Sequence, residues 1–183
     1  MGKSVILGGA RTPFGRLSGA LADKTAIELG AIAGNEAVKR GGIEPAELDH
    51  IFMGQVLQGG AGQNPARQVG FKMGLDKEVT ADTINKVCGS GMKATMLAHD
   101  IIKAGSAEVV LSGGMESMSN APYLLPKARA GYRAGHDRII DHMMMDGLED
   151  AYETGRSMGD FGEATAEAFQ FTRADQDKYA MET

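Results

Sequence analysis

Short apolar runs, each closed by turn residues, recur along the first part of the chain. Three of them, at 49–57, 79–87 and 108–112, are rich in apolar and β-branched residues and predict buried strands. A shorter run at 4–7 ends at a pair of glycines and predicts another strand. The chain is therefore expected to contain four strands before the pattern changes.

Stretches with helical periodicity separate these runs. Thr25 and Glu28 form a capping-box pattern that begins the first helix, which we expect to end near Gly41. An Asn-Pro pair begins the second helix, over 64–74, and the third covers 89–104. The alternation of strand and helix predicts an α/β layered domain with a largely parallel sheet.

The sequence changes in character after Ser117. Residues 118–160 are rich in Met, Gly, Arg and Asp and have weak periodicity, which predicts a loop-rich region. A capping pattern at Thr172 predicts one later helix. We therefore expect two domains, an α/β core over 1–117 and the beginning of a second domain over 118–183 that stops within a helix.

Composition narrows the class of protein. Hydrophobic residues make up 43% of the 183 residues and charged residues 23%, so the chain can bury a core. The net charge of −5 argues against non-specific nucleic-acid binding, which needs a basic surface. No apolar run approaches the roughly 18 residues of a membrane span. A single cysteine forms no internal disulfide, so we expect a reducing, cytoplasmic location.

The sequence around that cysteine carries most of the functional signal. A predicted strand ends at Val87, Cys88 follows, and Gly89-Ser90-Gly91 leads into a predicted helix. Because glycine permits a sharp turn, we expect the thiol at the N-terminus of that helix. The N–H groups and the dipole of a helix N-terminus favour a thiolate and can stabilise an oxyanion. A thiolate in that setting suits acyl exchange between thioesters.

A second interpretation of Cys88 stands beside the first, because a lone cysteine is often only a small buried core residue. The strand–Cys–Gly–x–Gly–helix context favours the nucleophile, by analogy with other nucleophile turns. No histidine of the sequence lies in a recognisable partner motif for a thiol. We therefore identify no catalytic base among His50, His99, His136 and His142.

Several segments, in the same order along the chain, resemble the thiolases. The most specific of them surrounds Cys88, and the Gly-Gly-Met-Glu-Ser-Met-Ser segment is similarly specific. The resemblance extends over essentially the whole chain. The segments that carry it are 11–15, 54–57, 62–68, 85–91, 113–119, 122–126 and 145–148. The resemblance implies a thiolase-like layered fold, of which this chain is the N-terminal half with the beginning of the inserted loop domain.

The resemblance also implies an activity. Cys88 would take the acyl group of an acyl-CoA, and a second acetyl-CoA or CoA would then complete the synthesis or cleavage of a 3-ketoacyl-CoA such as acetoacetyl-CoA. Leu148 and Met158 match positions that line the CoA and acyl pocket, although both side chains are also ordinary core fillers. The implied reactants are coenzyme A thioesters, with no metal or redox cofactor. The implied whole protein is a homo-oligomer, a dimer or a tetramer, in fatty acid metabolism.

The sequence departs from the family pattern in two respects. Biosynthetic acetoacetyl-CoA thiolases carry His where this chain has Ser157, which leaves the preferred acyl group open. The family's second catalytic cysteine, its activating His and its oxyanion-hole Asn belong to a later half, so we expect this chain alone to be inactive. Two alternatives therefore stay open. One is a non-catalytic thiolase-like subunit or fragment that binds CoA or a partner chain, and the other is a thioester hydrolase.

Overall fold

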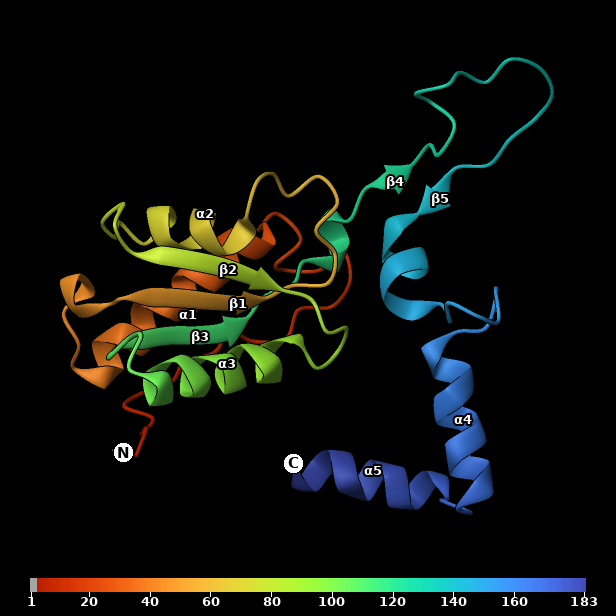
Figure 1. Cartoon of the computed structure of the whole chain (residues 1–183). Coiled ribbons are helices and arrows are strands. Elements are labelled where there is room, and N and C mark those ends of the chain that lie inside the picture. The colour runs from red at the N-terminus through yellow and green to blue at the C-terminus, as the bar shows by residue number, and fades with distance from the viewer. Residues whose placement is uncertain (1–2) are drawn as a thin grey trace. The chain divides into compact units, whose positions relative to one another are not determined.

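The computed structural model describes residues 3–183, which form two compact units (Figure 1). The first unit ends at His142 and the second is Met143–Thr183. Each unit is described by itself. A domain boundary after Ser117 stays a prediction. Among the described residues, no helix combines the length and the apolar character that crossing a membrane requires.

A three-stranded parallel sheet lies at the centre of the first unit. Its strands are β1 (His50–Gly54), β2 (Thr80–Ile84) and β3 (Val110–Gly114), in the order β2-β1-β3. Residue 54 of β1 pairs in register with residue 84 on one side and residue 114 on the other. The three strands end together, so the loops that follow them share one edge of the sheet. The predicted parallel sheet is confirmed.

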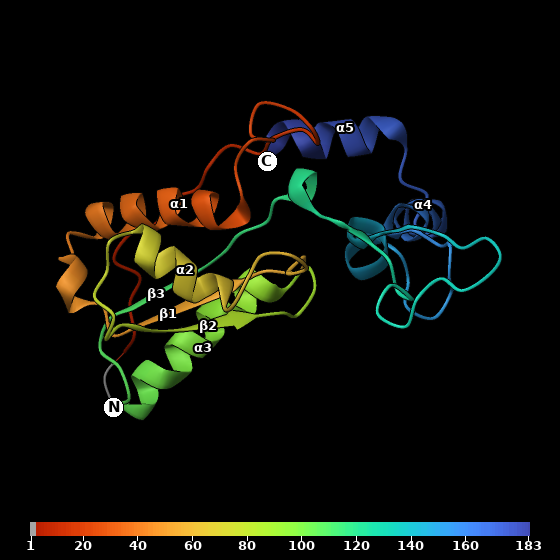
Figure 2. The same cartoon turned by 90° about the horizontal axis from the view of Figure 1, so that it is seen from above.

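Helices cover both faces of this sheet. α1 (Ala26–Gly41) and α2 (Pro65–Lys72) lie on one face and α3 (Ser90–Ala104) lies on the other, as Figure 2 shows.

Alternation along β1 supplies a core to each face. The side chains of Ile51 and Met53 join the core under α1 and α2, while Phe52 packs with Ala94 and Ala98 of α3. Because successive strand residues point to opposite faces, one buried strand serves both layers.

The helix boundaries follow the predicted capping residues. The hydroxyl of Thr25 accepts a hydrogen bond from the Glu28 N–H (3.2 Å), and the Glu28 carboxylate accepts one from the Thr25 N–H (2.9 Å). The Asn64 side chain caps α2 by accepting from the Arg67 N–H (3.3 Å). Gly42, one residue after the predicted stop, ends α1 with a φ of +66°, a conformation that favours glycine.

The strand predicted at 4–7 is wrong. Residues 3–16 have no regular secondary structure. An apolar run becomes a strand only where another strand pairs with its backbone, and the sheet β2-β1-β3 includes no such partner. Consequently Val5, Ile6 and Leu7 remain 72%, 87% and 56% exposed.

Shorter elements complete the first unit. They are the 3₁₀ turns η1 (Pro45–Glu47) and η2 (Met118–Asn120) and the strands β4 (Tyr123–Leu124) and β5 (Ile140–Asp141). β4 and β5 pair antiparallel as a separate two-stranded sheet.

The second unit is largely helical. It contains the π-helical turn η3 (Met144–Leu148) and the helices α4 (Met158–Ala168) and α5 (Arg173–Glu182). The predicted helix start at Thr172 is confirmed, since its hydroxyl accepts from the Asp175 N–H. The first turn of α4 lies in the region that we expected to be loop-rich.

Candidate active site

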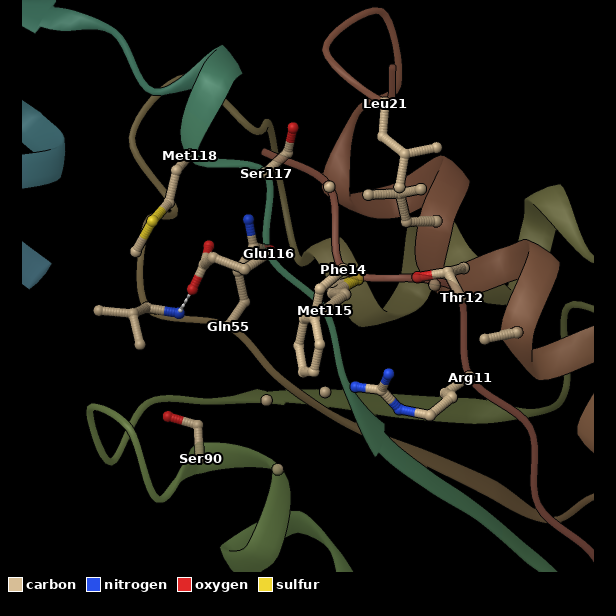
Figure 3. Close-up of a pocket in the computed structure, with 18 of the residues that line it drawn as sticks. Arg11, Thr12, Phe14, Leu21, Gln55, Ser90, Met115, Glu116, Ser117 and Met118 are labelled. Atoms are coloured by element: carbon tan, nitrogen blue, oxygen red, sulfur yellow. Dashed lines mark hydrogen bonds between the residues drawn. The ribbon is translucent and has the colours of Figure 1, made fainter. Parts of the chain in front are cut away.

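An open cleft of about 540 Å³ lies in the first unit, where the strands of the parallel sheet end. Its lining comes from residues 10–17 and 21 of the N-terminal segment, one face of α1, the end of β1 with the residues that follow it, the turn that carries Cys88, and residues 114–119. Figure 3 shows Ser90 on one side of the cleft, Arg11 and Thr12 on another, and Glu116 between the strands' ends and η2. Ligands of parallel α/β sheets bind at such carboxyl ends.

Cys88 lines this cleft and is exposed. It lies between β2 and α3, two residues before the first residue of the helix. Gly89 occupies the N-cap position and provides no side-chain cap for the first turn of α3. The predicted arrangement of strand, thiol and helix is therefore present, and the alternative of a buried core cysteine is wrong. The catalytic role of Cys88 remains a proposal.

The turn at Cys88 is tightly hydrogen-bonded. Val87 has a φ of +49°, in the left-handed region that a β-branched residue rarely adopts. The Ser90 hydroxyl donates to the Val87 carbonyl (2.6 Å) and accepts from the Lys86 N–H (2.8 Å). The Asn85 side chain accepts from the Val87 N–H (3.0 Å). The side chains on either side of Cys88 thus fix the backbone that presents the thiol.

Three glycines let α3 approach the strand ends. A Cβ on Gly54, the last residue of β1, would lie 2.5 Å from the Gly91 nitrogen and 2.8 Å from the Ser90 Cβ. A Cβ on Gly114 would lie 3.3 Å from the Gly91 Cα. The first turn of α3 therefore rests on backbone atoms of β1 and β3, and this contact sets the depth of the Cys88 turn.

Glu116 is the ionisable side chain at the base of the cleft. Its carboxylate accepts hydrogen bonds from the backbone N–H groups of Val56 (2.9 Å) and Leu57 (3.2 Å), which follow β1. Burial raises the pKa of the Glu116 carboxyl above its ordinary value. The two backbone N–H groups, and the nearby His142, act in the opposite direction. The carboxylate thus fixes the loop after β1 against the end of β3.

The N-terminal segment forms the opposite wall. The Arg11 guanidinium lies over the Phe14 ring, 3.9 Å from the ring centroid, in a cation–π contact. Phe14 itself is 89% exposed. Contacts to other parts of the chain border this wall on both sides, since the Arg40 guanidinium donates to the Gly9 carbonyl (3.4 Å) and the Ser18 N–H donates to the Ser119 hydroxyl (2.9 Å).

No histidine lines the cleft among the described residues. His142 is 5% exposed and its Nε2 accepts a hydrogen bond from the Gly59 N–H (3.1 Å). His99 contacts the Ser4 hydroxyl (2.6 Å), and His50 contacts the Thr80 hydroxyl (2.6 Å). These three hydrogen-bond partners do not line the cleft.

Comparison with known proteins decides the family. Residues 4–183 match the family model described as thiolase, N-terminal domain. The chain belongs to the thiolase family.

Individual thiolases agree with the family model. The chain is 48% identical to an acetyl-CoA acetyltransferase of Cupriavidus necator, with 97% of this chain and 45% of that protein aligned. It is 47% identical to acetyl-CoA acetyltransferase 1 of Arabidopsis thaliana, covering 97% and 43%. The chain therefore spans about half the length of the curated relatives it matches.

A solved thiolase shares the fold. The crystal structure of an Ascaris suum thiolase in complex with coenzyme A superposes with a TM-score of 0.88 at 37% identity. The alignment covers 97% of this chain and 46% of that one. The predicted thiolase-like α/β fold is confirmed.

The two predicted thiolase pocket residues lie in the second unit. Leu148 ends η3 and is half-buried, and Met158 begins α4 and is 40% exposed. An antiparallel bridge pairs Glu149 with Ser157, so Leu148 and Met158 lie on the same side of that bridge. Their pocket role stays a prediction, and the first unit alone supplies the cleft at Cys88.

Ser157 has a structural role in this thiolase chain. Its hydroxyl accepts from the Asp160 N–H (3.3 Å), and the Asp160 carboxylate accepts from the Ser157 N–H (2.7 Å). These reciprocal bonds form a capping box at the start of α4.

Sequence reasoning missed Glu116 and Ser90 as parts of the site. The signal for Glu116 was its position four residues after the end of the predicted strand 108–112, at the edge where Cys88 was expected. Ser90 was treated only as a small residue between two glycines. Its hydroxyl is buried, at 4% exposure, and bonds the residues on both sides of the turn.

Proposed function

We propose that this chain is part of an acyl-CoA C-acyltransferase of the thiolase type, with Cys88 as the acyl-accepting nucleophile. The observation that carries the proposal is the exposed thiol itself. It lies in the cleft at the strand ends and directly before α3, in a chain that matches proteins named acetyl-CoA acetyltransferase.

The first step of the proposed reaction is thioester exchange. The Cys88 thiolate attacks the carbonyl carbon of an acyl-CoA, the CoA sulfur leaves with the electron pair of the broken C–S bond, and the acyl group remains on Cys88. The first turn of α3 has no side-chain cap, so its N–H groups offer stabilisation to negative charge near the thiol. The step changes no oxidation state, so the proposal needs no metal or redox cofactor.

The second step forms or breaks a carbon–carbon bond. In synthesis, the carbanion of a second acetyl-CoA attacks the acyl carbon, and the Cys88 sulfur leaves. In cleavage, the Cys88 sulfur attacks C3 of a 3-ketoacyl-CoA, the C2–C3 bond breaks, and acetyl-CoA leaves as a carbanion that takes a proton at C2. The CoA sulfur then attacks the acyl carbon, and the Cys88 sulfur leaves. Proton transfer at C2 of acetyl-CoA needs a general acid or base, and the described residues that line the cleft include no histidine. We propose that the base belongs to the part of the whole protein outside these 183 residues.

Coenzyme A thioesters are the proposed substrates, supported by the solved Ascaris suum relative in complex with coenzyme A. Leu148 and Met158 are proposed to line the acyl and CoA pocket of the whole protein. The names of the relatives favour an acetyl group, while Ser157 leaves room for another acyl preference.

Further parts of the proposal concern the whole protein. We propose a cytoplasmic location, because an exposed single cysteine that must stay reduced suits a reducing compartment. We also propose a homo-oligomer, a dimer or a tetramer, that acts in fatty acid metabolism without nucleic-acid partners.

Acetyl transfer to Cys88 tests the proposal. The chain, and the Cys88→Ser variant as its control, are incubated with acetyl-CoA and measured by intact mass spectrometry with peptide mapping. The proposal expects the mass of one acetyl group on Cys88 and none on the variant. A thiol that reacts with iodoacetamide but never gains an acetyl group, in both the chain and the whole protein, would support the non-catalytic alternative instead. Rapid release of free acetate would support the hydrolase.

A further inference from the structure

The turn that carries Cys88 contains a backbone conformation that its own residue disfavours. Val87 has a φ of +49°, and its β-branched side chain is 54% exposed. A left-handed conformation at such a residue is strained and persists only where surrounding groups hold it. The groups that hold Val87 therefore determine where the following thiol lies.

One buried hydroxyl makes two of the hydrogen bonds that hold this turn. The Ser90 Oγ donates to the Val87 carbonyl at 2.6 Å and accepts from the Lys86 N–H at 2.8 Å. The backbone N–H of Ser90 also donates to the Val87 carbonyl, at 3.0 Å. The hydroxyl thus ties the residues before Cys88 to the first turn of α3, and at 4% exposure water does not replace it readily.

The surroundings restrict which side chain can do this. A Cβ on Gly54 would lie 2.8 Å from the Ser90 Cβ, so β1 presses closely on this position. Alanine would fit but would leave the Lys86 N–H without its acceptor. Serine is the smallest side chain that both fits and bonds to Val87 and Lys86.

We propose that Ser90 is a positioning residue for the nucleophile of the proposed acyl transfer, on which this inference rests. Its hydroxyl keeps Val87 in the left-handed region and so keeps the Cys88 thiol beside the N-terminus of α3. Without the hydroxyl, Val87 relaxes toward the extended region that β-branched residues prefer. The thiol then moves away from the N–H groups that favour its thiolate form.

Alkylation of Cys88 measures this directly, because the chain has one cysteine and the reaction needs no substrate. Rates with iodoacetamide are followed by intact mass between about pH 5 and pH 10, since the thiolate is the reacting form. Four chains are compared: the unaltered chain, Ser90→Ala, Thr95→Ala and the double variant Ser90→Ala with Val87→Gly. Thr95 is the matched control, because its hydroxyl also bonds a backbone carbonyl of α3, that of Gly91 (3.2 Å), while Thr95 itself does not line the cleft.

We expect Ser90→Ala to slow alkylation at pH 7 by about threefold to tenfold and to change its pH profile, because the thiol no longer lies beside the N-terminus of α3. The profile of Thr95→Ala should match that of the unaltered chain. The double variant should recover the original profile, because glycine adopts a positive φ without strain. The melting temperature of every chain shows whether it is folded. If Ser90→Ala folds poorly, the double variant, which also lacks the Ser90 hydroxyl, is compared with the unaltered chain instead.

An unchanged pH profile in a folded Ser90→Ala chain would overturn the inference. A shifted profile that Val87→Gly leaves unrepaired would also count against it, because the hydroxyl would then act by another route. These outcomes are independent of acetyl transfer. Failure of Cys88 to accept an acetyl group from acetyl-CoA would instead remove the proposed function, while leaving the alkylation result in place.

Discussion

The backbone N–H of Val56 donates a hydrogen bond of 2.9 Å to the carboxylate of Glu116, across 60 residues of sequence. This bond joins the loop after β1 to the end of β3, directly below the cleft that Cys88 lines. The Glu116 carboxyl is half-buried, and burial makes its ionisation less favourable than in water.

The pH dependence of stability should report this cost. Because burial raises the pKa of Glu116, the folded chain holds the proton more tightly than the unfolded chain does. The contribution of Glu116 to stability is therefore complete below its ordinary value of 4.5 and is lost as pH rises through the raised value. We expect the free energy of unfolding, relative to Glu116→Gln, to fall between pH 4 and pH 7 by about 1 kcal/mol or less, since solvent screens part of the charge.

Urea denaturation at several pH values measures the effect of Glu116→Gln. The exposed Glu78→Gln is the control and should show a difference that does not vary in this way. A relative stability that rises with pH would mean that the N–H groups of Val56 and Leu57 outweigh the burial of the carboxyl.

Substitution of Gly54 should disturb the contact between the first turn of α3 and the end of β1. In Gly54→Ala, the new Cβ would lie 2.5 Å from the Gly91 nitrogen, so backbone must shift, and we expect a loss of about 1–3 kcal/mol of stability. In Gly9→Ala, the control, the Cβ meets nothing within 4 Å. Urea denaturation of both variants checks this, and equal stabilities would show that α3 yields to the side chain without cost.

The cap of α4 offers a test within the second unit. Ser157→Ala removes the acceptor for the Asp160 N–H and should weaken the helix by about 1 kcal/mol. Hydrogen exchange of the peptide covering α4 is the measurement, with Ser157→Thr as the variant that keeps a hydroxyl. Protection that stays the same in Ser157→Ala would show that α4 does not depend on its capping box.

An assay of complete turnover should show that the chain alone does not carry out the second step of the proposed reaction. We expect these 183 residues alone to show no cleavage of acetoacetyl-CoA, because none of the described residues that line the cleft is a histidine and a general base contributes about 10²–10⁴-fold to rate. A full-length relative assayed in parallel supplies the reference. Cleavage by the chain above that of its Cys88→Ala variant would mean that another described residue acts as the base.

Local signals in the sequence predicted much of the fold. The caps at Thr25, Asn64 and Thr172 were found because each acts within four residues, where sequence and structure coincide. Three strands were found from short apolar runs, although their ends were misplaced by up to three residues. The strand at 4–7 failed because pairing depends on a partner that the apolar run does not specify.

The site was predicted less completely than the fold. Cys88 was placed at the start of a helix because glycines mark the turn there. The bond from Val56 to Glu116 spans 60 residues, so no local pattern shows it. The left-handed Val87 was not expected either, since a β-branched residue argues against that conformation and only its hydrogen-bonding neighbours impose it.

The glycine contact between α3 and the strand ends has a consequence for anyone who diversifies this protein. A Cβ at Gly54 or at Gly114 would lie within 3.3 Å of backbone atoms of α3, so a larger residue at either of these two positions requires the backbone that supports the Cys88 turn to shift. The exposed Met92 and Met96 on the same helix carry no such restriction. Neither methionine lines the cleft, so this face of α3 can vary while its contact with the strand ends stays the same.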